Sequence, residues 1–223
     1  MTVASLSVPF WSAAEIEGAL RLAILHLEEH RVLAYPTETV YGFGTAVDHA
    51  SVETLVQLKG RPAEKPFLLL IANPSMVTRL GLHLTPAASN FAARFWPGPL
   101  TLVLPGGDKR VPARLRGPEG GVAVRWTPHP GLQRLITAYG EPITSTSANR
   151  RGVPPASSAA EIVSQWPDAI HRGVMQVLDG GRLAASQPST VVDCTGRRPR
   201  VIRPGVFSAA VLRDCVSDLI GDA

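Results

Sequence analysis

Apolar residues along the chain alternate between a helical period and the short continuous runs of buried strands. Ile16, Leu20 and Leu27 share one face of a 3.6-residue period, which predicts an amphipathic helix. Ser12 precedes this pattern and is a favourable N-cap. Apolar runs of four to six residues recur further along the chain and predict strands. This alternation favours one α/β domain with a mostly buried sheet.

Caps and turn residues set the expected order of the elements. Further helices are expected to begin at Asp48 or Ser51, after Thr85, near Leu132, after Ser158 and at Ser208. Strands are expected at 31–35, 67–72, 100–104, 122–126, 142–147, 174–178, 190–193 and 200–203. Ser158 and Glu161 are spaced as a capping box. The last helix is expected to turn four residues inward: Val211, Leu212, Cys215 and Leu219.

Composition narrows the class of protein. The 223 residues are 45% hydrophobic and 18% charged, which excludes a disordered chain, and a single domain over residues 1–223 is expected. The longest apolar run, 67–72, is far below the ~18 residues of a membrane span, so no membrane association is expected. Two cysteines cannot staple a domain of this size, and no secretory signal is visible, which favours a cytoplasmic protein. The net charge of +4 permits an anionic partner without requiring one.

Several short motifs that resemble catalytic or metal-binding patterns are better explained by structural roles. Residues 26–30, HLEEH, fit an inverted zinc-protease pattern, but we interpret them as the last turn of the first helix, where cations suit the helix dipole. Cys194 and Cys215 lack a CxxC or histidine pattern and are interpreted as small buried hydrophobes, so no protein-ligated metal is predicted. Residues 42–44, GFG, lack the third glycine of a dinucleotide fingerprint, and no P-loop is present.

Polar and cationic residues gather where predicted strands end, the edge at which open α/β sheets bind ligands. They are Thr37, Glu38, Thr39, Lys59, Arg61, Lys65, Arg125, Ser145, Ser147, Asn149, Ser189, Thr190 and Arg203. Hydroxyls, one amide and several cations together suit a ligand that carries phosphates and a carboxylate. No pair of carboxylates stands out for acid–base work. Catalysis by positioning and charge stabilisation is therefore expected.

Seven motifs give the chain a resemblance to a known family. They are PTETVYGFG (36–44), KGRPAEKP (59–66), FWPGPLTLVL (95–104), VAVRWTPHP (122–130), STSAN (145–149), STVVD (189–193) and RPG (203–205). In this order they resemble the YrdC/TsaC family of L-threonylcarbamoyladenylate synthases, over a motif core of residues 36–205. The resemblance implies a YrdC-like fold, a twisted mixed sheet with helices around a large concave cavity. Since the chain ends at Ala223, the extra C-terminal domain of longer members is not expected.

The resemblance implies a nucleotidyltransferase. L-threonine, bicarbonate and ATP, the last with Mg²⁺, would give threonylcarbamoyl-AMP, pyrophosphate and water. A downstream tRNA threonylcarbamoyl-transfer complex would use the product to form threonylcarbamoyladenosine at position 37 of tRNA. The expected class is thus an ATP-binding transferase of tRNA processing.

The resemblance also implies roles for individual residues. The family's catalytic set is matched by Lys59, Arg61, Ser147 and Asn149. ATP would be held by these four residues with Lys65 and Arg203. Threonine would be held by Thr37, Arg125, Ser145 and Ser189, with the threonine carboxylate on Arg125.

Departures from the usual family pattern bear on these roles. Lys65 stands where many relatives have Asn and adds charge near the phosphates. Leu70 stands where they often have His, which removes a polar contact near threonine and weakens the expectation of strict threonine specificity. Gly121 replaces a common Thr, Arg151-Gly152 replaces a Ser-Gly pair, and Pro155 replaces a common Ser.

Two other functions stay open at this point. The first is carbamoyl transfer of the hydrogenase-maturation type, whose factors contain a related domain but also acylphosphatase and cysteine-rich zinc regions. Two cysteines and 223 residues leave no room for those regions. The second is a module for double-stranded or structured RNA, suggested by a pI near 9.5, whose binding would fall steeply with salt.

Overall fold

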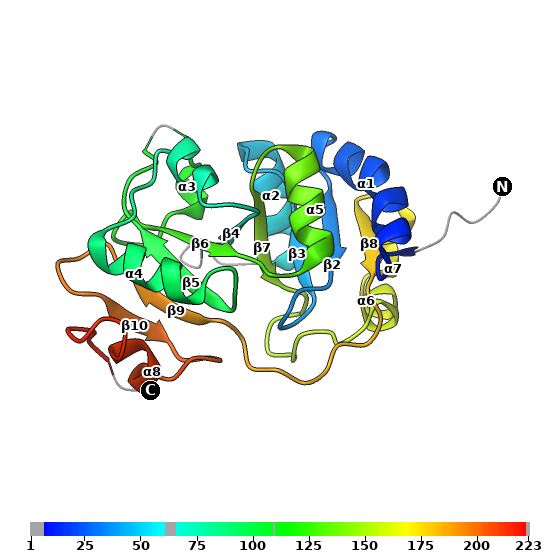
Figure 1. Ribbon diagram of the computed structural model, residues 1–223. Coiled ribbons are helices and arrows are strands. Elements are labelled where there is room, and N and C mark those ends of the chain that lie inside the picture. Colours follow the sequence, from blue (N-terminus) through cyan, green and yellow to red (C-terminus); the bar gives the residue numbers. More distant parts are fainter. Residues whose placement is uncertain (1–6, 61–65, 109, 222–223) are drawn as a thin grey trace.

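The computed structural model describes residues 7–60, 66–108 and 110–221, and these residues form one mixed sheet of ten strands (Figure 1). The strands lie in the order β1-β8-β2-β3-β7-β4-β6-β5-β9-β10. Their bounds are β1 Ser7–Pro9, β2 Val32–Tyr35, β3 Gly42–Gly44, β4 Leu68–Ile71, β5 Leu100–Leu104, β6 Val122–Trp126, β7 Ile143–Ser147, β8 Met175–Asp179, β9 Thr190–Asp193 and β10 Arg200–Arg203. Strand β4 pairs parallel with β6 and antiparallel with β7, so the predicted mixed sheet is confirmed.

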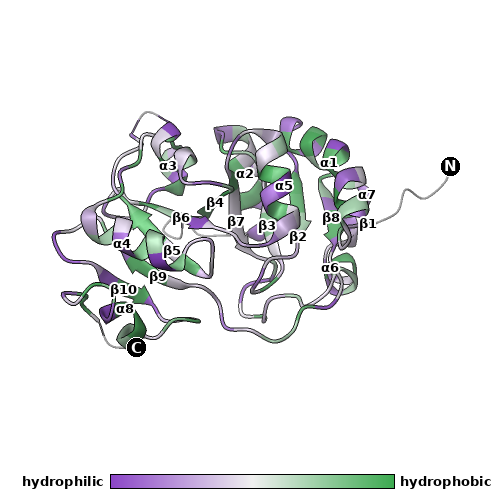
Figure 2. Cartoon of the chain, viewed as in Figure 1, coloured by the Kyte–Doolittle hydropathy of each residue, from purple (hydrophilic) through white to green (hydrophobic). Residues whose placement is uncertain are grey.

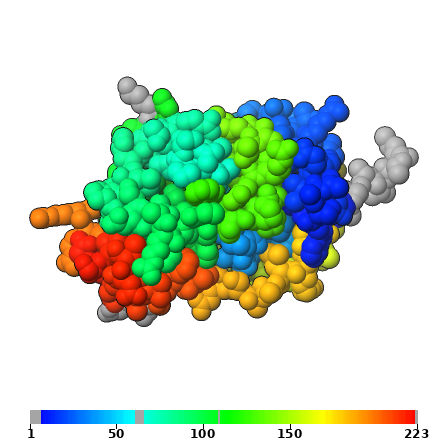
Figure 3. All heavy atoms as spheres, viewed as in Figure 1, coloured from blue at the N-terminus to red at the C-terminus, as the bar shows by residue number. Residues whose placement is uncertain are grey.

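Helices lie along this sheet on both halves of the molecule. Their bounds are α1 Ala13–Glu28, α2 His49–Lys59, α3 Ser75–Arg79, α4 Pro86–Phe95, α5 Pro130–Tyr139, α6 Ala159–Gln165, α7 Pro167–His171 and α8 Ala209–Arg213, with a 3-10 turn at Ala113–Leu115. Helices α1 and α5 pack side by side, and α6 and α7 pack against β8. Figure 3 places the N-terminal helix and the C-terminal segment at opposite ends of one face. No helix in the described ranges combines the length and apolarity that a membrane crossing requires.

Much of the sheet is apolar, and Figure 2 shows strands such as β4 and β8 in green. All four residues of β2 are buried. In β5, successive side chains point to opposite faces of the sheet. Leu100, Leu102 and Leu104 are fully buried on one face, while Thr101 and Val103 on the other line a cavity. Burying each leucine stabilises the fold by roughly 1.5–3 kcal/mol, so the apolar face anchors the strand that presents the cavity face.

Strand β3 is the GFG segment, which the sequence pattern did not predict as a strand. It pairs antiparallel with β2 on one side and with β7 on the other. A Cβ on Gly44 would lie 2.1 Å from the carbonyl oxygen of Thr144 and 2.5 Å from the hydroxyl of Tyr35. Glycine is therefore required here because the neighbouring strands leave no room for a side chain.

Most helix ends follow the predicted caps. Helix α1 begins with a capping box between Ser12 and Glu15, and α2 is capped by Asp48 at its start and by a left-handed Gly60 at its end. The predicted box at Ser158 is wrong. The Ser158 side chain does cap α6, but the Glu161 carboxylate accepts hydrogen bonds from the backbone and hydroxyl of Ser157.

The last helix is shorter than predicted. Helix α8 covers only Ala209–Arg213. Leu212 and Leu219 are buried as expected, but Val211 is 39% exposed and Cys215 is half-buried. The apolar period continues past the helix because the following turns also pack inward, so the period alone does not mark where the helix ends.

Candidate active site

A cavity of about 430 Å³ opens on one face of the sheet, a volume typical of sites for small molecules. It is bordered by strands β3, β4, β5, β6, β7, β9 and β10 and by the loops at 37–40, 117–121 and 188–189. Six of the predicted site residues line it: Thr37, Arg125, Ser145, Ser147, Ser189 and Arg203. Lys59 and Asn149 lie beside Ser147 but are not in the lining, and Arg61 and Lys65 lie outside the described residues.

Arg125 is the buried cation of this cavity. It is only 4% exposed and comes from β6, where it shares a face with the cavity residue Ala123. Its Nε lies 3.5 Å from Oε1 of Glu38, and Oε2 of Glu38 accepts a hydrogen bond of 2.9 Å from the Thr127 hydroxyl. A buried guanidinium with one carboxylate partner keeps donors for a second anion. Its planar fork suits a carboxylate ligand.

Ser189 stands at the rim where β9 begins. Its hydroxyl is 2.9 Å from the Thr101 hydroxyl and accepts a 2.9 Å hydrogen bond from Nη2 of Arg203, which also donates to the Ser189 carbonyl at 2.7 Å. Gly205 lies so close to this segment that a Cβ would be 2.2 Å from the Pro188 carbonyl oxygen. The RPG motif therefore holds the serine in place through Arg203 and leaves room for its backbone through Gly205.

Lys59 ties the end of α2 to the end of β7. Its ammonium donates to the Ser147 carbonyl at 2.8 Å, to the Asn149 side-chain oxygen at 2.9 Å and to the Asn149 carbonyl. The Ser147 hydroxyl donates to the same side-chain oxygen at 2.7 Å. These bonds gather three of the predicted catalytic residues into one cluster at the cavity edge.

The hydroxyl of Thr37 shapes a turn. It donates to the Val40 carbonyl at 2.7 Å and accepts from the backbone N–H groups of Thr39 and Val40, both at 3.1 Å. These bonds occupy its donor and both lone pairs. The contribution of Thr37 to a ligand would therefore come through the turn that it organises.

Two departures from the family pattern lie at or beside the cavity strands, Leu70 on β4 and Gly121 in the loop before β6. Leu70 is fully buried and stands opposite Arg125 in the parallel pairing of β4 and β6. A Cβ on Gly121 would lie 2.6 Å from side-chain carbons of both Thr195 and Val103, so a larger residue would require those side chains to move. Arg151, Gly152 and Pro155 are exposed and are not part of the lining.

Sequence reasoning missed several polar residues of the cavity. Asp193 accepts hydrogen bonds from the backbone and hydroxyl of Thr195, and its other oxygen lies 3.5 Å from Nη2 of Arg200. Arg200 also lies 3.6 Å from Glu119 across the rim. The signal for Thr101 was present, as a lone hydroxyl in the apolar strand LTLVL. The pairing of Asp193 with Arg200 depends on the β9–β10 register, which the sequence does not display.

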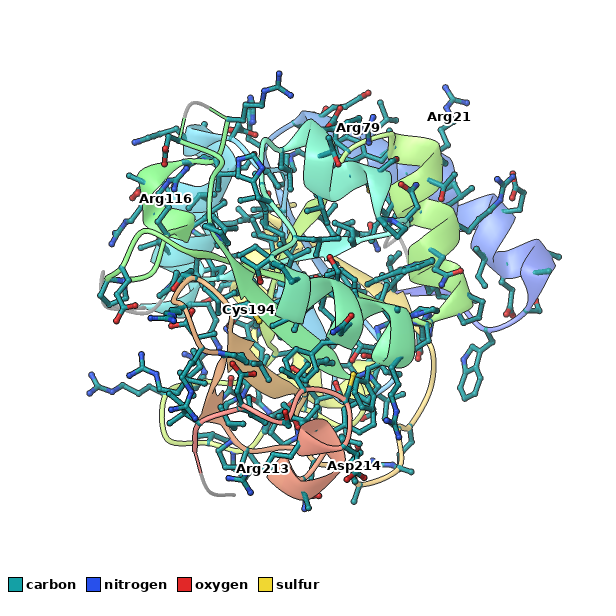
Figure 4. The ribbon with its side chains drawn as sticks, turned by 60° about the vertical axis from the view of Figure 1, so that its left-hand side comes forward. Arg21, Arg79, Arg116, Cys194, Arg213 and Asp214 are labelled. Atoms are coloured by element: carbon teal, nitrogen blue, oxygen red, sulfur yellow. The ribbon has the colours of Figure 1, made fainter. Side chains whose placement is uncertain are left out.

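His26 lies in the last turn of α1 as expected, whereas His30 follows the end of that helix. Cys194 is 1% exposed and lies within the body of side chains in Figure 4, and burial raises the pKa of its thiol to about 12. Burial lowers the pKa of His26, and His30 contacts Asp48 and Ser51 at 3.2 and 3.0 Å. Within the described ranges, no group of three or more His, Cys, Asp or Glu side chains is placed to hold a metal ion.

Fold and cavity together define an α/β protein with a buried cation in a ligand-sized cavity of a mixed sheet. The model of the Sua5/YciO/YrdC family, described as "Telomere recombination", matches residues 26–205. The chain belongs to this family.

Known relatives share both the sequence and the fold. The threonylcarbamoyl-AMP synthase of Pyrococcus abyssi is 37% identical over 190 residues, which are 85% of this chain and 54% of that protein. The enzyme of the same name from Marinobacter nauticus is 38% identical over 171 residues, 76% of this chain and 88% of that one. The crystal structure of P. abyssi Sua5 complexed with L-threonine superposes with a TM-score of 0.84 at 32% identity, over 96% of this chain and 62% of that one. The chain thus spans about half to two thirds of the archaeal relative and most of the bacterial one.

Proposed function

We propose that the chain is an L-threonylcarbamoyladenylate synthase and that the cavity binds threonine and ATP. The observation that carries the proposal is Arg125, a buried cation on the cavity floor of a chain whose relatives are named threonylcarbamoyl-AMP synthase. The names of these relatives favour this function over the RNA-binding and hydrogenase-maturation alternatives. The crystallised complex of P. abyssi Sua5 with L-threonine adds that a relative binds this amino acid.

The cavity residues suggest how the reaction would proceed. Arg125 would hold the threonine carboxylate as a bidentate pair, and the hydroxyls of Ser145 and Ser189 would hold the other polar groups of the amino acid. The threonine amine would take up the carbon of bicarbonate with loss of water. One oxygen of the resulting carbamate would attack the α-phosphate of ATP, and pyrophosphate would leave with the electron pair of the broken P–O bond.

Catalysis in this proposal comes from positioning and charge. Holding the carbamate against the α-phosphate converts an encounter of separate molecules into a reaction within one complex. Arg203 at the rim, the Lys59–Ser147–Asn149 cluster, and Arg61 and Lys65 would stabilise the charge of the triphosphate. Mg²⁺ would enter with ATP as part of the substrate, bound mainly by phosphate oxygens and water.

The cellular setting is proposed by the same reasoning. Threonylcarbamoyl-AMP would pass in the cytoplasm to a separate tRNA threonylcarbamoyl-transfer complex. Any direct contact with RNA would be weak and electrostatic, because the net charge is only +4 and many arginines are paired with carboxylates.

Release of pyrophosphate tests this function. With ATP, Mg²⁺, bicarbonate and L-threonine, the purified protein is expected to release pyrophosphate continuously. Omitting either threonine or bicarbonate is expected to reduce the rate to background, because the attacking carbamate requires both. A coupled phosphate assay measures the rate. Turnover that is unchanged without either substrate would contradict the synthase.

A further inference from the structure

We propose that Glu38 is a positioning residue for the substrate carboxylate, which it controls by orienting Arg125. This inference rests on the proposed function, since it assumes that Arg125 binds the carboxylate of threonine. Glu38 is not among the described residues that line the cavity, whereas Arg125 is. Its side chain is within ion-pair distance of Arg125 and acts on the cavity through that residue.

Glu38 is the only carboxylate within ion-pair distance of Arg125 in the described part of the chain. The side chains of Arg125 and Glu38 are 5% and 15% exposed, and Nε lies 3.5 Å from Oε1. Apart from this ion pair, these two atoms have no hydrogen-bond partner among the described residues. A carboxylate on the Nε side leaves the two terminal nitrogens of the guanidinium for a ligand. Glu38 thereby determines that the terminal nitrogens of the Arg125 guanidinium, and not Nε, face the substrate.

Two sets of contacts hold Glu38 itself. The Thr127 hydroxyl accepts from the backbone of His129 at 3.1 Å and donates to Oε2 of Glu38 at 2.9 Å, so its proton is directed at the carboxylate. The turn at 37–40 fixes the backbone of Glu38 through the three bonds of the Thr37 hydroxyl. The turn of the PTET motif thus fixes the backbone of Glu38. The hydroxyl of Thr127, which follows β6, holds the Glu38 carboxylate beside Arg125.

Loss of the Glu38 carboxylate has two opposite consequences. As an anion, Glu38 competes with the substrate for Arg125, so its removal would tighten threonine binding if charge were its only effect. As a positioning group, it holds the guanidinium in the geometry of a bidentate pair, so its removal would weaken binding. The proposal predicts a net loss of threonine affinity, because a guanidinium that is not held in place loses its paired hydrogen bonds to the carboxylate.

The experiment compares wild-type protein with Glu38→Gln, Arg125→Ala and the double variant. In Glu38→Gln, the KM for L-threonine is expected to rise about tenfold, while the KM for ATP and kcat change less than twofold. The double variant is expected to bind threonine no more weakly than Arg125→Ala alone, because Glu38 acts only through Arg125. Calorimetric titration with L-threonine measures the same losses without turnover.

Thr127→Val and Glu17→Gln complete the design. Thr127→Val keeps both charges and removes only the directing hydroxyl, so about a threefold rise in the threonine KM is expected even if Glu38→Gln does not fold. Glu17→Gln removes a carboxylate from the exposed ion pair with Arg134 and is expected to change neither constant. Unchanged or tighter threonine binding in Thr127→Val, and in Glu38→Gln where that variant folds, overturns the positioning role alone if the wild-type protein binds threonine. Wild-type protein that binds no threonine overturns the proposed function and this inference together.

Discussion

Replacing Arg125 by Ala is expected to lower kcat/KM for threonine by about 10²-fold or more. Removing one well-placed charged donor from a preorganised site has an effect of this size. Arg125→Lys is expected to recover only a small part of the loss, because a single ammonium cannot form the paired hydrogen bonds of a guanidinium with a carboxylate. Initial rates of pyrophosphate release at varied threonine concentration measure both variants.

Folding and function are separated in the same experiment. Arg125→Ala leaves the Glu38 carboxylate without its ion-pair partner in a buried place, which costs about 3–5 kcal/mol of unfolding free energy. Arg125→Lys retains a charge there and is expected to fold with a smaller cost. Arg134→Ala breaks an exposed Arg–Glu pair and serves as the control, with no change in activity and at most about 1 kcal/mol in stability. Near-normal threonine kinetics in a folded Arg125→Lys protein would contradict the assigned role of Arg125.

Replacing Gly44 by Ala is expected to lower the free energy of unfolding by about 3 kcal/mol or more. The added Cβ would lie 2.1 Å from the Thr144 carbonyl oxygen and 2.5 Å from the Tyr35 hydroxyl. Those two atoms already share a hydrogen bond of 2.9 Å, so β2, β3 and β7 must separate or lose it. Of these strands, β7 carries Ser145 into the cavity, so activity is expected to fall with stability.

Gly18 provides the matched control for this substitution. It is an exposed residue of α1, and a Cβ built there meets no atom within 4 Å. Gly18→Ala is therefore expected to stabilise the protein by roughly 0.5–1 kcal/mol, because alanine favours the helix and restricts the unfolded chain. Urea unfolding of both variants measures the two changes. Equal stability of Gly44→Ala and wild-type protein would show that β3 does not pass between β2 and β7 as described.

Local signals in the sequence predicted the longer elements well. Helices α1 and α2 have a side-chain cap at their first turn, and a left-handed glycine ends α2, so both could be placed from single residues. Strand β3 was missed because three residues are too few to show a period. Its glycines are required by close contacts with neighbouring strands, which no local pattern in the sequence reveals. Helix α8 was predicted too long because the apolar residues in the turns that follow it are spaced as they would be in a continued helix.

The site was predictable in its residue types and only partly in its geometry. Arg125 lies near the end of β6, Ser145 lies in the middle of β7, and Ser189 directly precedes β9. All three line the cavity, although β4 and β5 separate these strands in the sheet. The contact between Glu38 and Arg125 joins segments 87 positions apart (125 − 38), and no local pattern reveals it. The bonds that place Lys59 on Ser147 and Asn149 likewise depend on tertiary packing.

The most direct test of the central claim identifies the product with labelled bicarbonate. The protein is incubated with ATP, Mg²⁺, L-threonine and ¹³C-bicarbonate, and the nucleotides are analysed at once by mass spectrometry. The proposed reaction predicts an adenylate with the mass of threonylcarbamoyl-AMP that is one mass unit heavier than with unlabelled bicarbonate and is absent without threonine. Formation of AMP or ADP as the sole nucleotide product, with no labelled adenylate, would contradict it.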